Sequence, residues 1–238
     1  DHARRLRELS QSEVAAFRAR WSDTPLADRL YGIWLDDLAE RGEWDVYVRS
    51  YSMSGSASNA PTADVARQCT YLRALDRSGE HAAAMAAVGP LWRVGTSQPK
   101  TCDALFALWI ERGLVTNGIV WERLTLALQA RSWDLARYLA ALLSPELKRQ
   151  GDLFYHVARD PTLVRDTTRF ATNDEATRAI VVFGLRRLAQ TDPDAAATAW
   201  SAYRDRLTFD ATETRTIRQD LTIGFARNGV IDADADLT

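Results

Sequence analysis

Apolar residues recur at spacings of three and four along most of this 238-residue chain, and this period is the strongest constraint on its fold. The spacing places apolar side chains on one face of an α-helix. No segment alternates apolar and polar residues over a useful length, so the sequence predicts an all-α protein. One expected apolar face comprises Leu26, Leu30, Ile33, Trp34 and Leu38.

Proline and glycine mark where these helices are expected to begin and end. Proline is tolerated in the first turn of a helix, and glycine is favoured just after the last turn. The prolines at expected helix starts are Pro25, Pro61, Pro90, Pro99, Pro145, Pro161 and Pro193. The glycines at expected helix ends are Gly42, Gly79, Gly113 and Gly229. The spacing of Ser10 and Glu13 is that of a capping box.

The helix ends recur at a nearly constant interval. Gly42 and Gly79 lie 37 residues apart, and Gly79 and Gly113 lie 34 apart, which is the length of a helical-hairpin repeat. The repeat is degenerate and TPR-like. It predicts a right-handed α-solenoid, a superhelix of stacked helical hairpins. The one obvious loop spans 50–63, and no linker is long enough to divide the chain, so we expect a single domain over 1–238.

Composition and charge exclude several classes of protein. The formal net charge is −2, and acids interleave with the arginines, so we expect no nucleic-acid partner. No apolar run approaches the roughly 18 residues that a membrane span needs. The chain begins at Asp1 rather than methionine, and we expect it to be a fragment of a longer protein.

No motif in the sequence predicts catalysis. The nucleophile elbow, the phosphate-binding glycine loops and the paired-histidine zinc motif are all absent, so we assign no catalytic residue. The histidines His2, His81 and His156 share no ligand spacing, and we expect no metal and no cofactor. Acids such as Asp36 and Glu40 lie on polar helix faces, as solvated residues do.

Two features leave alternatives open. The eight tryptophans mostly have apolar helical spacing, which favours packing between helices over sugar-stacking platforms. Cys69 and Cys102 lie 33 positions apart, each on the apolar side of an expected helix. A disulfide between them and two separate buried thiols are equally compatible with the residues.

The stretch 95–109 resembles one family of enzymes. Its motif residues are Gly95, Ser97, Pro99, Lys100, Cys102, Asp103, Leu105, Phe106 and Trp109. This pattern, together with Cys69 upstream, is similar to the N-terminal superhelical, U-shaped domain of the soluble lytic transglycosylases of Gram-negative bacteria. The resemblance continues through 121–127, 135–140, 160–164 and 178–194.

The resemblance carries several expectations. It favours a structural disulfide between Cys69 and Cys102, and a periplasmic, monomeric protein. It implies a helical scaffold whose partners are peptidoglycan glycan strands and a catalytic domain that is missing from this chain. In the family that domain cleaves the β-1,4 bond between N-acetylmuramic acid and N-acetylglucosamine without water. The alternatives are a TPR-like protein–protein adaptor and a cytoplasmic helical-repeat regulator with two free thiols.

Overall fold

The computed structural model describes residues 9–53 and 64–228. Most of the expected loop at 50–63 lies outside these residues, as do His2, Pro61 and Gly229. The chain divides into two compact units, Asp1–Thr116 and Asn117–Thr238, which we name unit 1 and unit 2. The expectation of a single domain stays a prediction.

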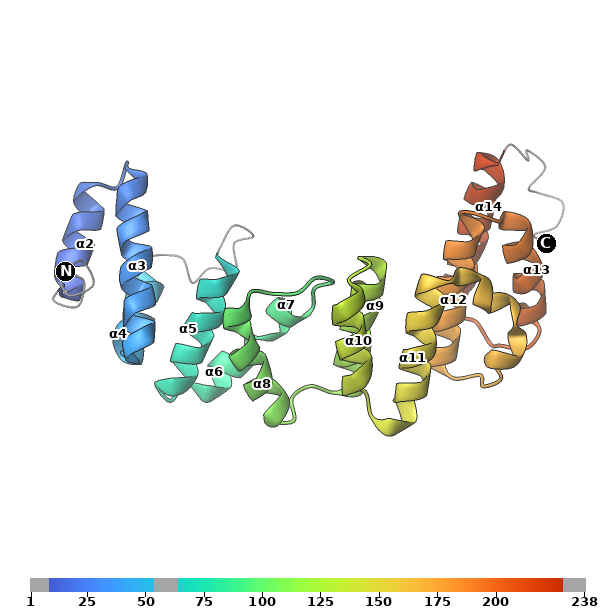
Figure 1. Ribbon diagram of the computed structural model, residues 1–238, viewed down its shortest axis with the longest axis horizontal. Coiled ribbons are helices and arrows are strands. Elements are labelled where there is room, and N and C mark those ends of the chain that lie inside the picture. The colour runs from blue at the N-terminus through green and yellow to red at the C-terminus, as the bar shows by residue number, and fades with distance from the viewer. Residues whose placement is uncertain (1–8, 54–63, 229–238) are drawn as a thin grey trace. The chain divides into compact units, whose positions relative to one another are not determined.

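Unit 1 contains helices that pack against their neighbours in sequence (Figure 1). Helix α3 contacts α2 and α4, α4 contacts α5, and α5 contacts α6, η1 and α8. The elements of unit 1 are α2 (Gln11–Arg20), α3 (Pro25–Arg41), α4 (Trp44–Met53), α5 (Val65–Arg77), α6 (His81–Ala86), α7 (Gly89–Trp92), the 3₁₀ helix η1 (Lys100–Cys102) and α8 (Asp103–Glu111).

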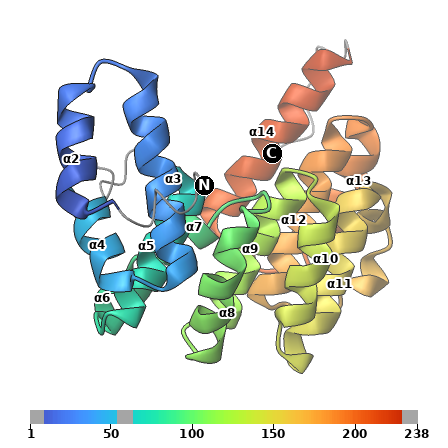
Figure 2. The same ribbon diagram turned by 60° about the vertical axis from the view of Figure 1, so that its left-hand side comes forward.

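In unit 2 the helices also pack against their neighbours in sequence. Helix α12 lies at the centre of these contacts, and it packs against α11, α13 and α14 (Figure 2). Its elements are α9 (Asn117–Gln129), α10 (Trp133–Leu142), α11 (Pro145–Arg159), the 3₁₀ helices η2 (Pro161–Arg165) and η3 (Thr167–Arg169), α12 (Glu175–Ala189), α13 (Pro193–Arg204) and α14 (Ala211–Arg227). Within the described residues no strand occurs, and the expectation of an all-α protein is confirmed.

Local sequence explains where many of these helices begin and end. Pro25, Pro145 and Pro193 occupy the first turns of α3, α11 and α13, where a missing N–H costs nothing. The capping box at the start of α2 forms as expected, with the Ser10 N–H donating to Glu13 Oε2 at 2.8 Å. This bond lowers the pKa of Glu13, because it stabilises the ionised carboxylate.

Helix ends use the left-handed backbone region. Gly42, Gly79 and Gly113 have φ values of 72°, 98° and 70°, which glycine adopts without steric cost. Between α9 and α10, Arg131 adopts this left-handed conformation, with a φ value of 58°. A side chain there costs roughly 1–2 kcal/mol, so the tight turn between α9 and α10 is imposed by the packing of the two helices.

The core of unit 1 joins α2, α3, α4 and α5 through large buried side chains. Its buried members are Val14, Trp34, Leu35, Leu38, Tyr47, Tyr51 and Ala74. The expected apolar face of α3 is partly wrong. Trp34 and Leu38 are buried as expected, but Leu26 and Ile33 are 64% and 44% exposed, because Ala27 and Leu35 face the core in their place.

The core of unit 2 depends on close approach between helices. A Cβ on Gly184 of α12 would overlap the side chain of Val164 in η2, and a Cβ on Gly224 of α14 would overlap the carbonyl oxygen of Ala189. Tyr203 of α13 is fully buried, and its hydroxyl donates to the Val164 carbonyl at 2.7 Å. Glycine at these two positions therefore lets α12 lie against η2 and α14.

Candidate functional site

The structure joins the two cysteines by a disulfide. Cys69 lies in α5 and Cys102 is the last residue of η1, with their Cα atoms 5.0 Å apart. Both residues are fully buried. The bond therefore ties α5 to the start of α8 within unit 1.

The rest of the motif stretch packs around this bond. Leu105, Phe106 and Trp109 of α8 are buried. Trp92 of α7 is 1% exposed, and its ring lies edge-on to Phe106 at 5.2 Å and near Trp109 at 5.8 Å. Such edge-to-face pairs add to the large apolar area that each ring buries. The motif thus builds an aromatic core beside the disulfide.

One buried carboxylate lies near this core. Asp76 of α5 is 5% exposed, and its Oδ1 accepts hydrogen bonds from His81 Nδ1 at 2.8 Å and Arg112 Nη1 at 2.7 Å. Burial alone would raise the pKa of Asp76, but these hydrogen bonds outweigh it and hold the pKa below its usual value. His81 and Arg112 also border a cavity of about 710 Å³ with Met85 and Trp109.

We expect Asp76→Asn to lower the free energy of unfolding of unit 1 by about 2 kcal/mol at pH 7, since it removes charged hydrogen bonds. A carboxylate with a lowered folded pKa contributes stability above its unfolded pKa of about 3.9, and that stability is lost as the pH falls through the folded pKa. The difference between the two proteins should therefore shrink below about pH 4. Urea unfolding at several pH values measures it.

The matched control is Asp28→Asn, because Asp28 forms a 3.3 Å ion pair with Arg18 but its side chain is 74% exposed. Exposed pairs contribute little, so this variant should unfold like the wild type. An Asp76→Asn difference that stays constant down to pH 2 would contradict the assigned titration.

A larger cavity lies among α2, α3 and α4 and has a volume of about 1000 Å³. Tyr31 lines it, with the Arg18 guanidinium 4.4 Å above its ring and its hydroxyl donating to the Ser50 carbonyl at 2.6 Å. Arg49, Ser10 and Ser12 add polar groups to the wall. We name this the α2–α4 cavity.

Two polar atoms in the wall of the α2–α4 cavity are unsatisfied. The indole nitrogen of Trp34 and the hydroxyl of Ser50 are buried, and neither has a hydrogen-bond partner among the described residues. Buried polar groups are normally paired, and leaving one unpaired costs roughly 1–3 kcal/mol. Aromatic side chains with a few polar groups are the usual wall of a site for a small polar ligand. This cavity is the candidate functional site.

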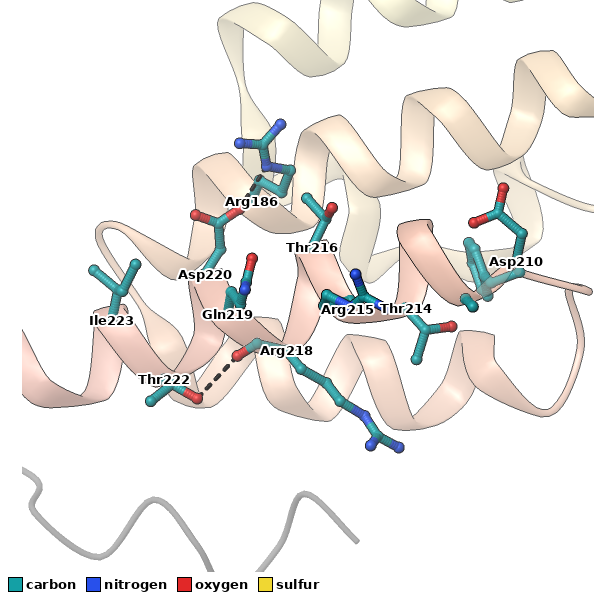
Figure 3. Close-up of a pocket in the computed structure, with 12 residues that line it drawn as sticks. Arg186, Asp210, Thr214, Arg215, Thr216, Arg218, Gln219, Asp220, Thr222 and Ile223 are labelled. Carbon is teal, nitrogen blue, oxygen red and sulfur yellow. Dashed lines mark hydrogen bonds and ion pairs between the residues drawn. The ribbon is translucent and has the colours of Figure 1, made fainter.

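A shallow groove of about 1040 Å³ follows α14 in unit 2 (Figure 3). The figure shows Arg186 of α12 reaching Asp220, with which it forms a hydrogen-bonded ion pair, and Thr222 donating to the carbonyl of Arg218. Ile223 is 48% exposed at one end of the groove. Polar groups that line the groove are thus already engaged in these two hydrogen bonds.

The tryptophans and histidines that the sequence singled out mostly pack against other side chains of the fold. Trp34, Trp92, Trp109 and Trp200 are buried, as expected for packing, whereas Trp21 is 44% exposed. His81 bonds to Asp76, and the ring of His156 lies 5.7 Å from that of Tyr155.

Neither a metal centre nor a spanning helix is present in the described part of the chain. No three His, Cys, Asp or Glu side chains in residues 9–53 and 64–228 lie together as a metal site requires. None of the helices there combines the length and apolar character of a membrane crossing.

Sequence reasoning did not identify the buried charges Asp76 and Arg123. Arg123 of α9 is 3% exposed, and burial lowers its pKa to about 10. The sequence contains a signal for Asp76, because this residue occupies the next helical position after the apolar face of Val65, Cys69 and Leu72 and should therefore lie on the buried side.

No family model matches the chain. A soluble lytic murein transglycosylase from Salmonella typhimurium is 26% identical over 211 residues, which cover 89% of this chain and 32% of that protein. Its counterpart in Escherichia coli K12 is 25% identical over 170 residues, covering 71% of this chain and 25% of that protein. The chain therefore spans about a third or less of the length of these curated relatives.

Solved structures share the fold. An inactive mutant of the lytic transglycosylase Slt from Pseudomonas aeruginosa has a TM-score of 0.81 and 35% identity, covering 97% of this chain and 36% of that one. The 70-kDa soluble lytic transglycosylase, solved in complex with bulgecin A, has a TM-score of 0.74 and 21% identity over 99% of this chain and 38% of that one. The expected α-superhelical fold class is confirmed by these matches. The chain thus matches, in sequence and in fold, a partial domain of the soluble lytic murein transglycosylase family.

Proposed function

We propose that this chain is the helical scaffold domain of a periplasmic soluble lytic transglycosylase from a Gram-negative bacterium. It holds glycan strands of peptidoglycan and supports a catalytic domain elsewhere in the same protein. The observation that carries this proposal is the match of 97% of the chain, at 35% identity, to part of the Pseudomonas aeruginosa enzyme. The buried disulfide supports an oxidising compartment.

The α2–α4 cavity is the part of the scaffold that we assign to glycan. The Arg18 guanidinium lies over the Tyr31 ring, and nearby polar atoms of Trp34 and Ser50 are buried without a hydrogen-bond partner among the described residues. A saccharide presents both hydroxyl groups and apolar ring faces, so it matches a wall of this composition. Glycoside cleavage would need a positioned acid, and we assign no carboxyl group of this chain to that role.

A sedimentation assay with purified peptidoglycan sacculi tests the proposal. We expect the chain to sediment with sacculi and to release no anhydromuropeptides. Arg49→Gln, which changes a cavity wall residue, should weaken binding severalfold, whereas Arg77→Gln, which removes an equal charge from an exposed position outside the cavity, should not. Cleavage of sacculi, or no affinity for them, would contradict the proposal.

A protein–protein adaptor is the second candidate. Exposed apolar side chains at Leu26 and Ile33 of α3, and at Ile223 of α14, favour it, because such residues suit contacts with another protein. An adaptor predicts no affinity for sacculi, so the same sedimentation assay separates the two functions.

A further inference from the structure

Two arginines of unit 2 converge on one tyrosine oxygen. Arg137 of α10 donates from Nη2 to the Tyr155 hydroxyl at 3.2 Å, and Arg159 of α11 donates from Nη1 to the same atom at 3.2 Å. Trp133 lies one turn before Arg137 on α10, with its ring edge-on to Tyr155 at 6.1 Å. We name these four residues the Tyr155 cluster.

The rings and the guanidinium groups form one continuous surface. Arg159 lies 5.9 Å from the Trp133 ring centre and 5.8 Å from that of Tyr155, and Arg137 lies 5.7 Å from the latter. Tyr155 is 8% exposed, whereas both arginines are exposed. The tyrosine oxygen is thus fixed by packing, while the arginines that it holds face solvent.

The charge of this cluster is not balanced by an ion pair. In the described residues neither Arg137 nor Arg159 forms a salt bridge with a carboxylate. The hydrogen bond to Tyr155 raises the pKa of Arg137, and Asp134, one turn earlier on α10, adds a smaller effect in the same direction. Elsewhere arginines of the chain do pair with acids. Examples are Arg18, Arg41, Arg67, Arg112, Arg178 and Arg186.

Two guanidinium groups gathered on a neutral oxygen suit an anion. Each guanidinium carries five N–H donors, so most of them remain after the bond to Tyr155. Their planar fork matches a carboxylate and forms two parallel hydrogen bonds with it. An anion between Arg137 and Arg159 would also offset their mutual repulsion. The Trp133 ring beside them offers an apolar face to the group that bears the anion.

We propose that the Tyr155 cluster is a carboxylate-binding site, which takes the free carboxylates of the peptide stems on peptidoglycan. This assignment deepens the proposed function and rests on it. The cluster lies in unit 2 and uses no residue of the α2–α4 cavity, so glycan and peptide stem are recognised by different side chains. We commit to carboxylate because the peptide stems that this proposal invokes carry that anion.

Calorimetric titration with a soluble disaccharide–peptide tests the site. The probe is used in two forms, with free carboxylates and with the same carboxylates converted to amides. The wild type should bind the free acid about tenfold more tightly than the amide, as hydrogen bonds to a charged group predict. Arg137→Gln with Arg159→Gln should abolish this preference and leave the weak binding of the amide unchanged.

The matched control removes two other arginine charges from unit 2. Arg149 and Arg169 are exposed and lie outside the cluster, and Arg169 pairs with Asp166. Arg149→Gln with Arg169→Gln should keep the tenfold preference, which separates the site from the effect of net charge. Arg137→Lys with Arg159→Lys keeps the charge but loses the planar fork, so we expect an intermediate preference for the free acid. This variant tests the site if the glutamine double variant fails to fold.

The outcomes distinguish the site from the proposed function. If the wild type sediments with sacculi but binds the acid and the amide equally, the carboxylate site is wrong and the proposed function stands. If it binds neither sacculi nor the probe, both are wrong. If inorganic phosphate displaces the probe as well as acetate does at equal concentration, the cluster is a general anion site and the commitment to carboxylate is wrong.

Discussion

Trp92→Ala should lower the free energy of unfolding of unit 1 by about 3–5 kcal/mol, the range for removing a buried aromatic side chain. Trp92 is 1% exposed and packs edge-on against Phe106 and close to Trp109. Its loss would leave a cavity between α7 and α8 that the short helix α7 cannot fill by itself. Urea unfolding followed by far-UV circular dichroism measures the change independently of tryptophan fluorescence.

Trp21→Ala is the matched control for this prediction. Trp21 is 44% exposed at the end of α2, and exposed substitutions usually change stability by about 0.5 kcal/mol or less. Equal losses in the two variants would show that the aromatic core beside the disulfide contributes no more than a surface ring does.

Replacing both Cys69 and Cys102 with serine should lower the free energy of unfolding of unit 1 by roughly 3–4 kcal/mol. The bond closes a loop of 33 positions, so breaking it restores conformational entropy to the unfolded chain. The double substitution avoids leaving one unpaired thiol. Urea unfolding with and without a reducing agent gives the size of the effect.

The reducing agent supplies the control for the disulfide. It should destabilise the wild type by about as much as the double substitution does and leave the double variant unchanged. Thiol titration of the unfolded, unreduced wild type should find no free thiol. Two free thiols would instead support the cytoplasmic regulator that the sequence left as an alternative.

The helical architecture could be predicted because its signals are local. Pro25, Pro145 and Pro193 lie in first turns, and Gly42 and Gly79 lie at helix ends, as their backbone preferences require. The period of three and four also identified the helices themselves. These signals depend on a few neighbouring residues, so one sequence is enough to read them.

The sequence could not predict which face of α3 is buried. The predicted face, with Leu26, Leu30 and Ile33 beside Trp34, has helical spacing, but so does the neighbouring face with Ala27, Tyr31 and Leu35 beside Trp34. The structure buries Ala27 and Leu35 and leaves Leu26 and Ile33 exposed. The choice depends on what α2 and α4 present to α3, and no local pattern contains that information.

The candidate sites depend on contacts between helices. Arg137 and Tyr155 are 18 positions apart and meet only because α10 packs against α11. Tyr31 and Ser50, 19 positions apart, meet because α3 packs against α4. The resemblance pointed to the family, and the fold was needed to show which side chains lie together.

The disulfide also sets how far unit 1 can extend when its ends are pulled. The 33 positions between Cys69 and Cys102 cannot lengthen while the bond is intact, which removes about 110 Å from the fully stretched chain. Unit 2 contains no cysteine and extends to its full contour length. Pulled from both ends, the chain would therefore lengthen more in unit 2 than in unit 1, and the short tether would keep α5 and α8 together after their helices had unravelled.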